Sequence, residues 1–159
     1  MIAVIGCGNT NRSDDGAGPF VIRALRAREG LPDAVRLLDA GTDGIAVMFA
    51  ARGCDALILV DACRPLGEPG AVYEVPGEEL ERSYEPSLNL HDFRWNHALH
   101  AGRQIYREEF PKEVAVYLIE AGTLELGLAL TPAVERAATL VAERIAGRLR
   151  GLCTEAAQP

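Results

Sequence analysis

The sequence is short of basic residues and of long apolar runs. Sixteen Lys and Arg stand against 23 Asp and Glu, which gives a net charge of −7 over 159 residues. A chain of this charge lacks the basic face that nonspecific nucleic-acid binding needs, so we expect no nucleic-acid partner. No apolar run approaches the roughly 20 residues that cross a bilayer, and no basic segment precedes the first apolar stretch as in a signal peptide. We therefore expect a cytoplasmic protein with no membrane contact.

Cysteine is also scarce, and its spacing is uninformative. The four cysteines form no C-x-x-C pair, so the sequence predicts reduced thiols rather than a disulfide framework or a structural metal site. No Gly-x-Ser-x-Gly motif is present, and no Cys-His-Asn signature accompanies Cys7, which we expect to pack as a small hydrophobe. These absences argue against a serine or cysteine protease.

What the sequence has is a regular alternation of apolar strand patterns and helical patterns. It predicts an α/β fold, a three-layer sandwich with a mostly parallel, twisted central sheet of about five strands and helices on both faces. We assign residues 1–153 to one such domain, residues 154–159 to a loose tail, and expect a monomer. The expected strands are Ile2–Ile5, Val35–Leu38, Ala56–Val60, Ala71–Val75 (an edge strand) and Val114–Ile119; the expected helices start near Gly16, at Ile45, near Asp92 and at Pro132, with Thr131 as N-cap.

The most informative segment is the loop that follows the first strand, GCGNTNRSDDGAG at 6–18. It lies where a nucleotide-binding fold would place phosphates at a helix N-terminus. Asp14 and Asp15 occupy that position, however, and two carboxylates repel an anion and attract a cation. The loop therefore indicates a site for a metal ion or a basic group on a nucleotide-fold frame.

Two further polar residues follow other predicted strands or precede a helix. Asp61 ends the apolar strand 57–60, and His91 stands just before a predicted helix. Ligands on such sheets collect at the carboxyl ends of the strands, so Asp14 or Asp15, together with Asp61 and His91, are expected to converge there. Two carboxylates and an imidazole suit a borderline divalent ion with coordination positions left open.

Each of these residues also has a purely structural interpretation. Asp14 or Asp15 would serve as a cap of the first helix, and Asp61 as a turn former after a buried strand. His91 would serve as a surface histidine. His97 and His100, three apart on a predicted helix, form a rival metal pair. For Asp14 we expect a position facing the helix N-terminus or solvent.

The loop at 6–18, together with LILVDA at 57–62 and SLNLHDF at 87–93, resembles the hydrogenase maturation proteases. Members of this family are endopeptidases that remove the C-terminal extension of a nickel–iron hydrogenase large subunit. The stretches LDAGTDG at 38–44 and LALTPAVE at 128–135 extend the resemblance over nearly the whole chain.

The resemblance implies functional residues and a partner. It places the metal-binding and catalytic residues at Asp15, Asp61 and His91. The metal would be nickel, supplied by the hydrogenase large-subunit precursor rather than held as a resident cofactor. The bound nickel would be recognised by the protease, and it would polarise a peptide carbonyl or lower the pKa of a water molecule.

Other functions remain open on the residues alone. A noncatalytic nickel-sensing assembly factor or metallochaperone would use the same three ligands. A dinucleotide-dependent oxidoreductase fits Gly6-x-Gly8, but Asn11 occupies the third glycine position. A phosphate-loop NTPase is set aside because no Gly-Lys-Ser/Thr closes the loop.

Overall fold

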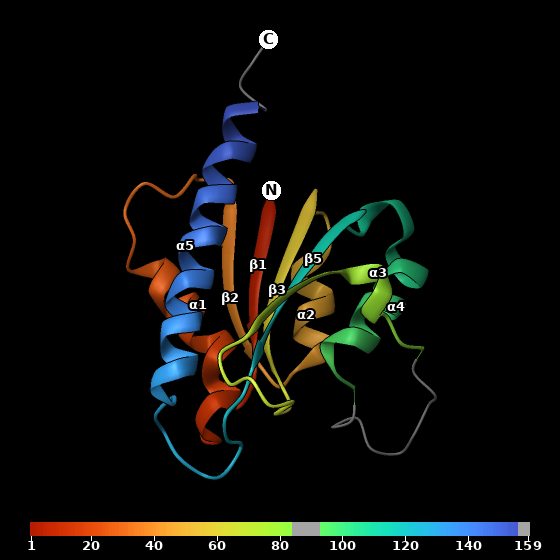
Figure 1. The fold of residues 1–159 in the computed structure, drawn as a ribbon. Coiled ribbons are helices and arrows are strands. Elements are labelled where there is room, and N and C mark those ends of the chain that lie inside the picture. Colours follow the sequence, from red (N-terminus) through yellow and green to blue (C-terminus); the bar gives the residue numbers. More distant parts are fainter. Residues whose placement is uncertain (84–92, 156–159) are drawn as a thin grey trace.

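The computed structural model describes residues 1–83 and 93–155, and its centre is a five-stranded sheet (Figure 1). The strand order is β2-β1-β3-β5-β4, in which β1, β2, β3 and β5 run parallel and the edge strand β4 pairs antiparallel with β5. The bounds are β1 Ile2–Cys7, β2 Val35–Gly41, β3 Ala56–Cys63, β4 Val72–Pro76 and β5 Glu113–Glu120. The α/β fold expected from the sequence is confirmed.

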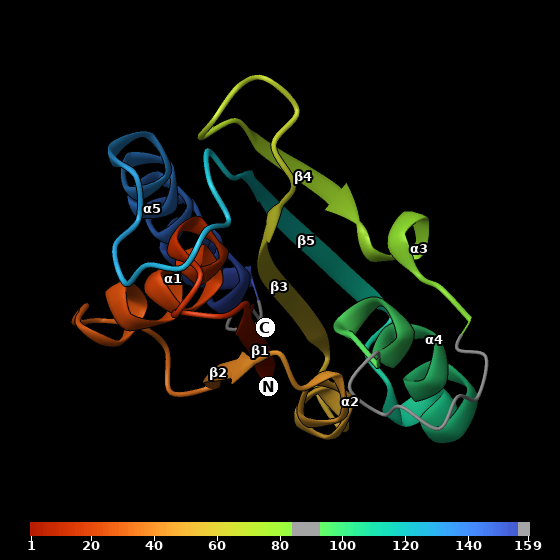
Figure 2. The same cartoon turned by 90° about the horizontal axis from the view of Figure 1, so that it is seen from below.

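Helices cover both faces of this sheet (Figure 2). On one face α1 and α5 pack over a core that includes Val4, Ile58 and Ile119; on the other, α2 and α4 pack over a core that includes Ile5 and Leu59. All six residues of β1 are buried, which explains why this strand is a continuous apolar run. The helical bounds are η1 Ser13–Gly16, α1 Ala17–Arg26, α2 Gly44–Ala51, α3 Gly77–Leu80, α4 Trp95–Tyr106, η3 Arg107–Glu109 and α5 Pro132–Glu155.

Most boundaries shift by one to three residues from the sequence expectation, and three of the differences bear on the site or on the tail. Strand β3 continues to Cys63, so Asp61 lies inside the strand rather than at its end. Helix α4 begins at Trp95 within the described part of the chain. Helix α5 extends through Glu155, so residues 154 and 155 are helical rather than part of a tail, while 156–159 lie outside the described residues. Among the described residues, no helix combines the length and apolar character that a bilayer crossing requires.

Two glycines bring α1 into close contact with the sheet. A Cβ atom on Gly18 would lie 2.2 Å from the Cys7 carbonyl oxygen and 2.5 Å from that of Val60. A Cβ atom on Gly6 would lie 2.4 Å from the Gly18 carbonyl oxygen. Any side chain at these positions would push the helix away, so the glycines fix how the first loop leaves the sheet.

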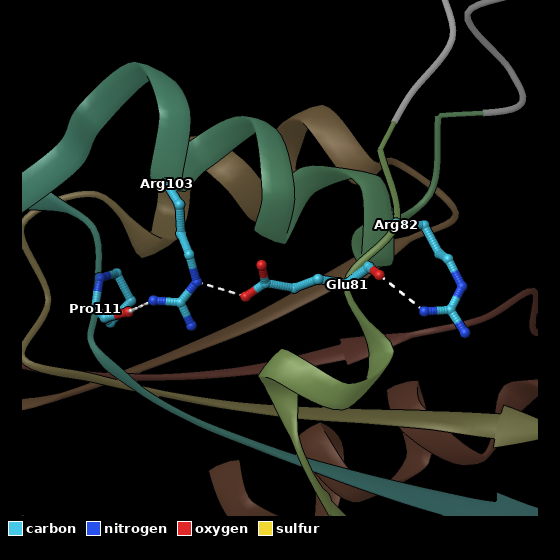
Figure 3. A network of polar contacts seen from close by, with 4 residues as sticks. All are labelled: Glu81, Arg82, Arg103 and Pro111. Carbon is cyan, nitrogen blue, oxygen red and sulfur yellow. Dashed lines mark hydrogen bonds and ion pairs between the residues drawn. The ribbon is translucent and has the colours of Figure 1, made fainter.

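A polar network ties α4 to the segment after α3 (Figure 3). The Arg103 guanidinium forms an ion pair with Glu81 and donates to the Pro111 carbonyl oxygen at 3.2 Å. The backbone N–H of Arg82 donates to the Asn96 carbonyl oxygen at 3.2 Å. Because both partners of the ion pair are largely shielded from water, this network holds α4 in place on its face of the sheet more firmly than an exposed pair would.

Asp14 does not face the helix N-terminus or solvent, so both expectations for it were wrong. Its side chain is fully buried and accepts hydrogen bonds from the backbone N–H groups of Gly122, Thr123 and Thr131 at 2.8, 3.1 and 2.6 Å. The Thr131 hydroxyl, expected to cap α5, donates to Asp14 at 2.9 Å. Asp14 therefore joins the first loop to the β5–α5 loop.

We expect Asp14→Asn to lower the free energy of unfolding by about 2–3 kcal/mol, because the amide group would face N–H donors in a buried site. Urea unfolding followed by circular dichroism measures the change. The matched control is Asp33→Asn, which removes the same charge at an exposed loop position and should leave stability nearly unchanged. Equal stability of the two variants would contradict the joining role of Asp14.

Candidate functional site

A cavity of about 180 Å³ opens at the carboxyl edge of the sheet. It is lined by the last part of β3, by the loops that follow β1, β2 and β5, and by residues at the starts of α2 and α4. Asp15 and Asp61, two of the three residues expected to converge, both line it, together with Arg12, Arg94 and Trp95. His91 lies outside the described residues.

The loop after β1 positions Asp15, and the glycines of this loop determine its path. Its Oδ2 accepts a hydrogen bond from the backbone N–H of Asn9 at 2.9 Å, and among the described residues its Oδ1 accepts none. The Asp15 backbone can approach this loop so closely because residue 8 is a glycine with a φ of +131°. A Cβ atom there would lie 1.8 Å from the Asp15 carbonyl oxygen. The same atom would lie 3.6 Å from Oδ1 of Asp61, so Gly8 lies between the two acidic residues.

Asp61 is held in one orientation by two donors. Its Oδ1 accepts from the backbone N–H of Ala62 at 2.8 Å and its Oδ2 from Trp95 Nε1 at 2.7 Å. Each carboxylate oxygen can accept more than one hydrogen bond, so both oxygens retain capacity for a further partner. The side chain is therefore oriented but not saturated.

The environment of Asp61 disfavours its charge. Burial raises its pKa from the ordinary value near 4 to about 6, and the neighbouring Asp15 charge adds to the rise. The hydrogen bonds from Trp95 and Ala62 and the positive charge of Arg94 act in the opposite direction but do not outweigh burial. A cation placed between the two carboxylates would relieve this unfavourable state, whereas an anion would aggravate it.

The remaining acidic and thiol groups that line the cavity have other roles. Asp43 caps α2 by accepting from the backbone N–H groups of Ile45 and Ala46 at 2.9 and 3.0 Å. Cys7 is buried, as expected, and its pKa is well above the usual value because of burial and the nearby Asp61 and Asp39 charges. A thiol held in its protonated form is a poor nucleophile.

The rival histidine pair does not reach the cavity. Nδ1 of His97 accepts from the backbone N–H of Arg94 at 3.2 Å at the start of α4, and neither His97 nor His100 lines the cavity. In residues 1–83 and 93–155 no three His, Cys, Asp or Glu side chains are grouped closely enough to hold a metal ion by themselves. A metal ion held between the two carboxylates would therefore need a further ligand from outside this set of residues.

Sequence reasoning missed Trp95 and Arg94 as parts of the site. Both come at the start of α4, directly after the segment expected to contain the histidine ligand. A signal existed, because Trp95 is the only tryptophan in the chain and an indole N–H that is shielded from water requires an acceptor. Nothing in the sequence, however, indicated that this acceptor would be Asp61.

We expect Asp61→Asn to gain about 2 kcal/mol of stability relative to the wild type between pH 4 and pH 8. Only the wild type carries the buried charge at the higher pH, whereas turning the amide nitrogen of the variant toward one of the two N–H donors costs the same at both pH values. In the unfolded chain this carboxyl titrates near 3.9, so between about pH 4 and 6 the folded state binds more protons. The contribution of Asp61 to stability therefore falls as pH rises through this window, and the full penalty applies above pH 6. Thermal unfolding of both proteins at the two pH values measures the difference; a pH-independent difference would contradict the raised pKa.

Comparisons with known proteins identify the family of this chain. A sequence model of the hydrogenase maturation protease family matches residues 19–148. The chain is 31% identical over 156 residues to the hydrogenase 2 maturation protease of Escherichia coli strain K12, covering 98% of this chain and 94% of that protein. It is 34% identical over 150 residues to the coenzyme F420 hydrogenase subunit delta of Methanothermobacter thermautotrophicus, covering 86% of each.

The fold comparison gives the same result. The solved structure of the hydrogenase maturating endopeptidase HybD from Escherichia coli superposes with a TM-score of 0.81 at 30% identity, covering 95% of this chain and 93% of that one. A hydrogenase maturation protease from Thermococcus kodakarensis, at 22% identity and a TM-score of 0.71, shares the fold over 94% of this chain and 92% of its own length. The resemblance noted in the sequence is confirmed, and this chain belongs to the hydrogenase maturation protease family.

Proposed function

We propose that this protein is an endopeptidase that removes the C-terminal extension of a nickel–iron hydrogenase large-subunit precursor after nickel has been inserted. The observation that carries the proposal is the pair Asp15 and Asp61 lining one cavity at the carboxyl edge of the sheet. Membership of a protease family supports the reaction type, since relatives of similar length are named as maturation proteases. Within the proposal, Asp15, Asp61 and His91 recognise the nickel.

In this proposal the nickel belongs to the substrate. Oδ1 of Asp15 and the unsaturated oxygens of Asp61 would complete its coordination shell, with His91 as the third protein ligand. Carboxylate and imidazole donors suit a borderline divalent ion. Because burial and the neighbouring carboxylate raise the pKa of Asp61, a cation gains more by binding here than at an exposed carboxylate. A precursor without nickel lacks that gain, which would make cleavage conditional on completed insertion.

The chain's own groups would orient the substrate rather than attack it. Trp95 Nε1 and the Ala62 N–H hold the Asp61 carboxylate in place, and Asn9 does the same for Asp15. The protonated thiol of Cys7 is not an activated nucleophile. The nickel of the substrate would supply the Lewis acid that polarises a peptide carbonyl or activates a water molecule.

A cleavage assay with two forms of one precursor tests the proposal. Purified protein is incubated with nickel-loaded and with nickel-free large-subunit precursor, and the products are measured by mass spectrometry. We expect shortening of the nickel-loaded form alone. A stable complex with the loaded precursor and no cleavage would instead identify an assembly factor, and tight binding of NAD or FAD would revive the oxidoreductase interpretation.

We expect Asp61→Asn and Asp15→Asn each to abolish detectable processing of the nickel-loaded precursor while leaving the protein folded. The neutral amide is a much poorer ligand for a divalent ion than a carboxylate is, yet it preserves the shape of the side chain. Asp33→Asn, at an exposed position, is the charge-matched control and should process normally. Full processing by Asp61→Asn would refute the assignment of this residue.

Processing should also decline as the pH drops from 7 to 5. Protons compete with the metal for Asp61, whose pKa is about 6, and for the His91 imidazole, whose reference pKa is about 6.5. Initial rates across this range, at fixed loaded precursor, measure the effect. Constant rates down to pH 5 would argue against both residues as ligands.

A further inference from the structure

The β5–α5 loop, residues 121–131, carries two highly exposed leucines. Leu126 and Leu128 are each 85% exposed, more than any other large apolar side chain in the described part of the chain. Single apolar side chains on a surface need no explanation, but two highly exposed leucines two residues apart on one loop form a candidate contact surface. The loop runs along the carboxyl edge of the sheet, between β5 and α5 (Figure 1).

The backbone that carries these leucines is held by hydrogen bonds to the first loop. Gly127, which lies between them, accepts a hydrogen bond from the Ser13 N–H at 2.8 Å and donates to the Asn11 carbonyl oxygen at 3.0 Å. A Cβ atom on Gly127 would lie 2.6 Å from Ser13 Oγ, so the loop lies directly against the segment that carries Asp15. A surface already ordered before binding loses little conformational entropy when a partner docks.

The exposed leucines are continuous with the candidate active site. Leu124, two residues before Leu126 on the same loop, lines the cavity that contains Asp15 and Asp61. Its carbonyl oxygen accepts a hydrogen bond from Arg12 Nε at 3.1 Å. The exposed leucines therefore lie on the same loop as part of the cavity lining, two and four residues from Leu124.

A second loop at the same edge also exposes a leucine on a backbone that hydrogen bonds hold in place. Leu66, in the loop after β3, is 62% exposed, and its N–H donates to the fully buried Glu120 at 2.7 Å, as does that of Gly67. Burial acts to raise the pKa of Glu120, but these N–H donors hold it below its usual value, so the carboxylate stays charged. A Cβ on Gly122 would lie 3.3 Å from Pro69, which places the two loops side by side (Figures 1 and 2).

We infer that Leu126 and Leu128 are the docking surface for the folded body of the hydrogenase large-subunit precursor. The inference rests on the proposed function and specifies where that partner binds outside the cavity. A cavity of about 180 Å³ admits one metal-bearing segment and not a folded domain, so the body of the partner must lie against the rim. The partner is thus a folded protein with an apolar patch beside its carboxyl-terminal segment.

Apolar docking also fits the charge of this chain. With a net charge of −7, long-range attraction would favour basic partners only, whereas leucine contacts act without regard to the partner's charge. Docking at the leucines would bring the metal-bearing segment to Asp15, which the same loop contacts help to position.

The test is the kinetics of cleavage of nickel-loaded precursor by the double variant Leu126→Gln/Leu128→Gln. Docking remote from the reacting atoms contributes equally to the ground state and the transition state, so its loss raises KM and leaves kcat unchanged. We expect KM to rise by at least about tenfold and kcat to stay within about twofold. The control is Leu140→Gln on α5, where the leucine is 43% exposed and lies away from the cavity; its KM should not change.

Other outcomes separate this inference from the proposed function. An unchanged KM in the double variant, or a wild-type dimer that the same substitutions convert to a monomer in light scattering, would overturn the docking surface. If the wild type cleaves nothing, interferometry with immobilised loaded precursor decides. Binding that the leucine substitutions weaken would retain the surface and refute the endopeptidase, whereas absence of binding would refute both.

Discussion

The carboxyl edge of the sheet depends on one buried carboxylate, that of Asp14. Its oxygens collect three backbone N–H groups and one hydroxyl from the β5–α5 loop, a segment more than a hundred residues further along the chain. A buried charge is tolerated only when hydrogen bonds replace its hydration, so these partners and Asp14 require one another. Through this contact the first loop, the end of β5 and the start of α5 form a single rigid unit.

The position of Asp15 depends on that unit because Asp15 directly follows Asp14 in the chain. With Asp14 directed into the protein, the short η1 turn presents Asp15 to the cavity on the other side, where Gly8 leaves room for its backbone. Asp61 reaches the same cavity from β3, oriented by Trp95. The two carboxylates are thus held by separate parts of the structure, Asp15 by the first loop and Asp61 by β3 and Trp95. They lie close together because both of these parts are fixed in place.

The electrostatic state of this pair connects the fold to the proposed reaction. Burial and the repulsion between Asp15 and Asp61 make the charge on Asp61 unfavourable in the absence of a cation. The stability of the rest of the fold offsets this cost and keeps the two carboxylates in place. Glu120 shows the contrasting case at the same edge, since its donors favour the charged form. A saturated carboxylate supports structure, whereas an oriented but unsaturated one is available to a ligand.

The sequence alone determined the succession of strands and helices along the chain. Apolar runs and helical spacing indicate how each segment is buried, whichever segments it packs against. The sequence also determined that acidic groups gather at the carboxyl edge, since strand direction places them there, and the family to which the loop motif belongs. Only the tertiary structure decided which of Asp14 and Asp15 is buried, that Trp95 orients Asp61, and that Asp61 lies within β3. Those outcomes depend on contacts such as Asp14 with Gly122, 108 residues apart, which no local pattern encodes.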